Sequence, residues 1–95
     1  MAIVVEVLVP LASRAESDRF DAGIDQAITE RGGPPEGFMV HIGRPEGDGF
    51  LMIDVWRNEA EWRAFFDEVI MPNLAAAGLS AEDPRVSPAW TFARP

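Results

Sequence analysis

The 95 residues include no cysteine, no lysine and no tyrosine, and only one histidine. The absence of cysteine excludes disulfides, thiolate nucleophiles and thiolate metal sites. With no lysine, all eight basic residues are arginines, and sixteen acidic residues bring the formal charge to −8. This charge argues against nucleic acid and anionic membrane surfaces as partners.

The sequence also lacks a long apolar run. The run near the N-terminus is short, Glu6 interrupts it, and no basic region precedes it. We therefore expect no signal peptide and no membrane span, with the cytoplasm as the default location. A hydrophobic fraction of 47% suits one globular domain over residues 1–95. A domain this small exposes much of its surface, so pairing with a second copy is expected.

The first third of the chain predicts a strand and a helix. Residues 2–9 are rich in β-branched side chains and predict a strand. Ser13 and Glu16 match a capping box, which predicts a helix that ends near Arg31. The acidic residues of this helix are expected on its solvated side, and they are Asp18, Asp21, Asp25 and Glu30.

The rest of the chain predicts a hairpin, a second helix and a last strand. Two apolar runs, near 37–44 and 49–57, flank a Pro-Glu-Gly-Asp-Gly turn and predict the hairpin. Asn58 is expected to cap the second helix, and Pro72 to break or kink it. Residues 85–93 read as a strand, and the proline within it favours an edge position.

The order of elements is therefore β-α-β-β-α-β. With right-handed crossovers it predicts an α+β, ferredoxin-like fold: a four-stranded antiparallel sheet in the order 4-1-3-2 with two helices on one face. No internal repeat or linker interrupts this order.

The hairpin predicts the pair that is most informative for function. A turn centred between Gly47 and Asp48 pairs positions whose numbers sum to 95, which places His41 opposite Asp54 and Met39 opposite Trp56. The only histidine would then face a carboxylate across one antiparallel rung. Such a pair is typical of an oriented acid or base.

Alternation along the strands separates two sets of side chains. One set is almost purely apolar: Ile3, Val5, Val7, Val9, Phe38, Val40, Ile42, Leu51, Ile53 and Val55. The other is mixed: Val4, Glu6, Leu8, Met39, His41, Phe50, Met52, Asp54 and Trp56. The mixed set predicts a cavity in which Glu6, His41 and Asp54 point the same way. Because two helices cover only one face, apolar residues such as Phe50, Met52 and Trp56 predict a homodimer whose two sheets close into a barrel.

Several readings of these residues stay open. His41 and Asp54 fit a structural pair, a catalytic acid or base with its orienting carboxylate, or a ligand-binding pair without chemistry. Glu6 fits an exposed or interface residue, or a second catalytic carboxyl. One histidine with two carboxylates is a weak metal signal, so no metal is expected. The candidate lining residues of a pocket are Met39, Met52, Trp56 and Phe65.

The order of elements, together with Ile-Asp-Val-Trp-Arg-Asn-Glu-Ala-Glu-Trp-Arg-Ala-Phe-Phe at 53–66, resembles the dimeric α+β barrel proteins. The antibiotic-biosynthesis-monooxygenase-like branch is the nearest. The resemblance covers nearly the whole chain and implies a homodimer with one small-molecule pocket per subunit beside the sheet. Members of this superfamily include cofactor-free oxygenases, haem-degrading enzymes and isomerases.

Two departures limit what this resemblance implies. Haem-degrading members use a histidine on the second helix, but residues 58–78 contain none, so neither haem nor another cofactor is expected. Quinone-forming members resemble a pattern of Asn, Trp and Tyr, whereas this chain has no tyrosine and only Asn58 and Asn73. The expected function is binding of a small apolar or aromatic molecule, with cofactor-independent monooxygenation, cyclisation or isomerisation through proton transfer. The alternative is a non-catalytic binding or structural dimer.

Overall fold

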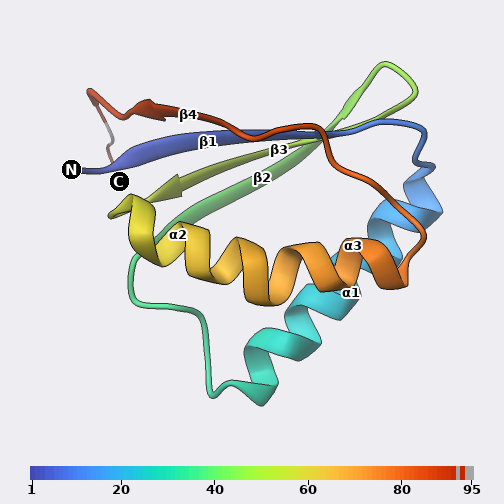
Figure 1. The fold of residues 1–95 in the computed structure, drawn as a ribbon, viewed down its shortest axis with the longest axis horizontal. Coiled ribbons are helices and arrows are strands. Elements are labelled where there is room, and N and C mark those ends of the chain that lie inside the picture. Colours follow the sequence, from blue (N-terminus) through green and yellow to red (C-terminus); the bar gives the residue numbers. More distant parts are fainter. Residues whose placement is uncertain (92, 94–95) are drawn as a thin grey trace.

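Four strands form one antiparallel sheet in the order β2-β3-β1-β4, and the helices lie against one of its faces (Figure 1). The computed structural model describes residues 1–91 and 93. The elements are β1 (Ile3–Val9), α1 (Arg14–Glu30), β2 (Phe38–Glu46), β3 (Gly49–Trp56), α2 (Glu59–Phe65), the π-helical segment η1 (Phe66–Ile70), α3 (Met71–Ala76) and β4 (Arg85–Pro88). This is the expected ferredoxin-like fold, because 2-3-1-4 is the order 4-1-3-2 read from the other edge.

Both helix starts follow from the local sequence. Ser13 and Glu16 form a complete capping box, in which each side chain accepts from the other's backbone N–H. The Asn58 side chain accepts from the N–H of Glu61 and so caps α2. These caps satisfy amides that have no partner inside the helix.

The expected irregularity near Pro72 takes the form of a π-helical turn. The segments α2, η1 and α3 run end to end as one helical stretch (Figure 1). Pro72 has no N–H to donate, and the Asn73 side chain donates to the carbonyl oxygen of Val69 at 2.8 Å. The wider turn therefore absorbs the proline without ending the helix.

The prediction of which residues share a face was wrong in part. Val5 lies opposite Asp54 and Val7 opposite Met52, so the odd residues of β1 share the helix-covered face with the even residues of β3. Glu6 lies opposite Ile53, on the other face. Alternation holds within each strand, but it does not set the register between β1 and β3, which no short turn connects.

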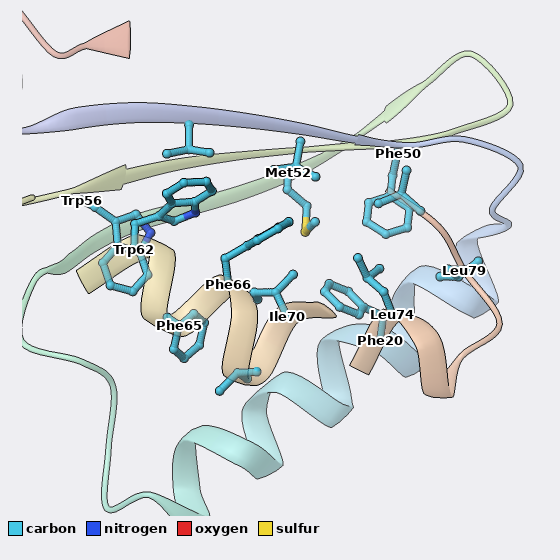
Figure 2. Close-up of a cluster of buried hydrophobic side chains, with 14 of the residues drawn as sticks. Phe20, Phe50, Met52, Trp56, Trp62, Phe65, Phe66, Ile70, Leu74 and Leu79 are labelled. Carbon is cyan, nitrogen blue, oxygen red and sulfur yellow. The ribbon is translucent and has the colours of Figure 1, made fainter. Parts of the chain in front are cut away.

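Buried apolar side chains form one cluster between the sheet and the helices (Figure 2). Phe50, Met52 and Trp56 lie in this cluster beneath the helices, so they are not the uncovered surface that was expected. Trp56 is fully buried and stacks on Phe38, with ring centroids 5.1 Å apart. No helix of the described residues covers the other face of the sheet (Figure 1).

The last strand is shorter than expected. β4 ends at Pro88 and pairs with β1 at the sheet edge, which agrees with the proline in it. Position 92 of the expected strand 85–93 lies outside the described residues. Within the described part of the chain, no helix has both the length and the hydropathy that crossing a bilayer requires.

Candidate active site

His41 lies opposite Asp54, as the turn predicted. The Nδ1 of His41 and Oδ1 of Asp54 are 2.6 Å apart, and the Nε1–H of Trp56 donates to Oδ2 of Asp54 at 3.2 Å. Both carboxylate oxygens therefore have a partner. Because Nδ1–H donates to the carboxylate, the second ring nitrogen of His41 is left for another group.

The three hydrogen-bonded side chains, those of His41, Asp54 and Trp56, lie on the helix-covered face of the sheet. The Asp54 side chain is 14% exposed and that of His41 is 35% exposed. The pair is therefore fixed from the buried side and accessible from the other. This geometry is what an oriented acid or base requires.

The pair opens on a cavity of about 310 Å³ between α1, the sheet and the second helical stretch. Six lining residues are apolar and four are ionisable, and together they are Phe20, Asp21, Ile24, Asp25, Ile28, Phe38, His41, Asp54, Phe65 and Ile70. The volume lies near the lower end of the range for small-molecule sites, about 300–1,000 Å³. An apolar wall with a few convergent polar groups is typical of such sites.

A second cavity, of about 360 Å³, adjoins the first. Its wall includes His41 and Asp21, which also line the first cavity, and it continues past Gly43 toward Ser13 at the start of α1. His41 therefore stands at the junction of an apolar compartment and a more polar one.

Neighbouring carboxylates raise the pKa of His41. The hydrogen bond with Asp54 is the largest cause, and the charges of Asp54, Asp21 and Asp25 act in the same direction. Partial burial opposes them by disfavouring the charged ring. His41 therefore holds its proton to a higher pH than an isolated imidazole.

The pKa of Asp21 is also raised. Removal from water is the largest cause, the charges of Asp25 and Asp18 add to it, and His41 opposes it. A carboxyl and an imidazole with perturbed pKa values in one cavity are typical of a functional site.

Phe38, which lines this cavity, lies at a bulge in β2. The register shifts between Phe38 and Val40, so that Phe38, and not Met39 as predicted, lies opposite Trp56. The loop before the bulge is held by Glu61, whose carboxylate accepts from the N–H of Gly37 at 2.7 Å. A Cβ on residue 37 would lie 2.6 Å from Oε2 of Glu61, so a larger residue would displace this carboxylate from its present position.

The predicted site residues are only partly brought together. Phe65 lines the cavity, whereas Met52 and Trp56 are buried beside it and Met39 is at the bulge, with none of these three in its wall. Glu6 does not join His41 and Asp54, because it lies on the opposite face and pairs across the sheet with Ile53 and Arg85. The expected three-residue constellation is therefore a two-residue pair.

Sequence reasoning missed Asp21 and Asp25. Both are exposed, as expected for the solvated side of α1, but they also line the cavity with His41, which was not predicted. Each directly follows an apolar residue of the buried stripe, Phe20 or Ile24, and this border position was the available signal. Among the described residues, no group of three or more metal-ligating side chains is placed to hold an ion.

Comparison with known proteins supports the fold. No family model matches the sequence, and no curated protein is detectably similar to it. The structure is similar to that of SnoaB, a cofactor-independent oxygenase from Streptomyces nogalater, with a TM-score of 0.64 and 18% identity over 96% of this chain and 94% of SnoaB.

Two further structures share this arrangement. Protein YjcS aligns with a TM-score of 0.63 and 12% identity over 94% of this chain and 99% of its own. A candidate antibiotic biosynthesis monooxygenase from Deinococcus radiodurans aligns with a TM-score of 0.61 and 12% identity over 99% of this chain and 97% of its own. The chain therefore has the fold that its resemblance implied, that of the antibiotic-biosynthesis-monooxygenase-like proteins.

Proposed function

We propose that the cavity between α1 and the β2–β3 hairpin binds a small, largely apolar molecule, and that His41 exchanges a proton with it without a cofactor. The observation that carries this proposal is the 2.6 Å contact between His41 and Asp54 at the wall of an apolar cavity. A purely structural pair needs no such opening. The likeness of the fold to a cofactor-independent oxygenase supports the same chemistry.

His41 has two roles open to it, and pH distinguishes them. Below its raised pKa the imidazolium donates a proton or stabilises an anion that forms on the substrate. Above that pKa the neutral ring accepts a proton from a phenol or from a carbon beside a carbonyl group. Asp54 orients the ring in both cases. A base would make the rate rise with pH through the pKa of His41, and an acid would make it fall.

Removal of such a proton serves oxygenation, cyclisation and isomerisation alike. Monooxygenation takes dioxygen as its co-substrate, whereas cyclisation and isomerisation do not, so oxygen consumption separates these reactions. A polyketide-like or other aromatic phenol suits the Phe38 and Phe65 side of the cavity.

The test begins with a panel of hydroxylated aromatic compounds, followed by NMR of the His41 ring and by assays of turnover with and without oxygen. We expect His41→Gln to abolish turnover and keep the fold, while Asp67→Asn, an exposed site away from the cavity, keeps both. Full activity in folded His41→Gln would refute the catalytic role and favour the alternative, a non-catalytic binding or structural dimer.

We also propose that the chain is a homodimer joined through the open face of the sheet. That face carries an apolar patch in which Ile42 is 49% exposed, and its other, partly exposed members are Val4, Leu8, Val40, Ile53 and Val55. Glu6 and Arg85, of opposite charge, are neighbours on it. A second copy, placed by a two-fold axis, supplies both an apolar surface and complementary charges.

The test of the dimer is the mass in solution. Light scattering should give twice the chain mass for the wild type and one chain mass for Ile42→Arg. The matched control is Leu11→Arg, because Leu11 is 77% exposed but lies in the loop between β1 and α1. A monomeric wild type would refute the dimer without affecting the proposal for the cavity.

A further inference from the structure

Acidic groups outnumber basic groups in the wall of the 310 Å³ cavity. Its wall has three carboxyl groups, those of Asp21, Asp25 and Asp54, and one imidazole, that of His41. None of the arginines in the described part of the chain is part of this wall. With the carboxyls ionised, three negative charges face at most one positive charge.

Two arginines of the adjoining cavity offset this imbalance only in part, since the charge of Arg14 acts on Asp21. Arg14 and Arg44 line the adjoining cavity, but each is already paired: Arg14 with Asp18 at 2.9 Å and Arg44 with Glu46 at 2.8 Å. Among residues 1–91 and 93, a protonated His41 is thus the one cation in the wall of the apolar cavity, and its Nδ1–H donates to Asp54. A ligand carboxylate would meet the negative charges of Asp21 and Asp25, which water screens only in part at such short range.

We propose that this cavity selects its ligand by charge: it takes an apolar ring system whose polar end is an uncharged hydroxyl or a protonated amine, and it rejects carboxylates. This inference rests on the proposed function, since it names the substrate class of the same cavity. The rings lie among Phe38, Phe65 and the isoleucines of α1, and the polar end lies at His41, where the two cavities meet.

Charge complementarity gives the expected order of affinity. A protonated amine gains from the carboxylates, and a neutral hydroxyl can donate to one of them or accept from His41. A carboxylate of the same size gains only from His41 and is opposed by Asp21 and Asp25. The anion should therefore bind at least about tenfold more weakly than the neutral compound.

The experiment uses three probes with the same two-ring body: 2-naphthol, 2-naphthoate and 2-(aminomethyl)naphthalene. Calorimetry at pH 7 gives their affinities, and the ring resonances of His41 report whether binding occurs in this cavity. We expect naphthoate to bind most weakly. The double variant Asp21→Asn/Asp25→Asn should strengthen naphthoate binding by about tenfold and change naphthol binding by less than about threefold.

The control makes the same change in net charge elsewhere. Glu36→Gln/Asp67→Asn alters two exposed residues outside both cavities and should leave the order of affinities unchanged. Naphthoate binding as tightly as naphthol would overturn the charge selection while leaving the cavity as a ligand site. Failure of all three probes to shift the His41 resonances would overturn the proposed binding function, and this inference with it.

Discussion

The two faces of the sheet use alternate residues of the same strands in opposite ways. On the covered face, Trp56 is fully buried and hydrogen-bonded, and the polar pair of His41 and Asp54 opens on a hollow. On the open face, Ile42 is half exposed beside a row of aliphatic residues. The covered face holds a polar pair beside buried aromatic rings, and the open face leaves aliphatic side chains partly exposed.

This difference is the basis of the two proposals, a small-molecule ligand on the covered face and a second copy on the open face. On the covered face, a cavity lies between α1 and β2–β3, beside the packed aromatic side chains. Aliphatic side chains at regular spacing form a smooth surface, which suits another sheet. Mutations that affect one face and spare the other therefore test this comparison.

The largest expected effect comes from Trp56→Ala. This change removes a fully buried side chain that stacks on Phe38 and lies 5.4 Å from the ring of Phe65, and it should lower the free energy of unfolding by about 3–5 kcal/mol. Chemical denaturation measures the loss. Trp90→Ala is the matched control, since Trp90 is 93% exposed, and it should stay within about 0.5 kcal/mol of the wild type. Equal losses would contradict the assignment of the core.

A smaller effect is expected for Asp54→Asn. The amide oxygen still accepts one hydrogen bond, but His41 and Trp56 can no longer both be satisfied by a charged acceptor. The free energy of unfolding should fall by about 1–3 kcal/mol. The pKa of His41 should also fall, because its largest raising contact is lost. An unchanged NMR titration of His41 would contradict the hydrogen bond.

The same pair makes stability depend on pH. The folded pKa of His41 is raised, so the folded state binds more protons than the unfolded state between the unfolded value of about 6.5 and the folded one. Its contribution is complete below the unfolded pKa and is lost as pH rises through the folded pKa. Asp21, whose pKa is also raised, acts in the same direction at lower pH. Denaturation curves from pH 5 to 9 should show this decline, and Asp54→Asn should flatten it near neutrality.

The smallest effect is expected for Glu6→Gln. Glu6 lies on the open face, with the sheet between it and His41. Its removal should leave the titration of His41 unchanged. A clear shift in the pKa of His41 would mean that the charge of Glu6 acts on His41 through the sheet.

Features that depend on residues near one another in the chain could be predicted from the sequence. The capping residues Ser13 and Asn58 predicted both helix starts, and the turn at Gly47 and Asp48 predicted the rung of His41 and Asp54. The order β-α-β-β-α-β then sufficed for the topology of the sheet. Local turn geometry and capping act over a few residues, so their outcome can be read from them.

Contacts between side chains that are distant in the sequence depend on tertiary packing. The register between β1 and β3, which places Glu6 away from the pair, is set by packing between strands about forty residues apart in the chain. Packing also places Phe38 in the cavity wall, through the bulge in β2, and places Asp21 of α1 in the same wall. These choices follow from how whole apolar surfaces fit together, and no short stretch of sequence contains that information.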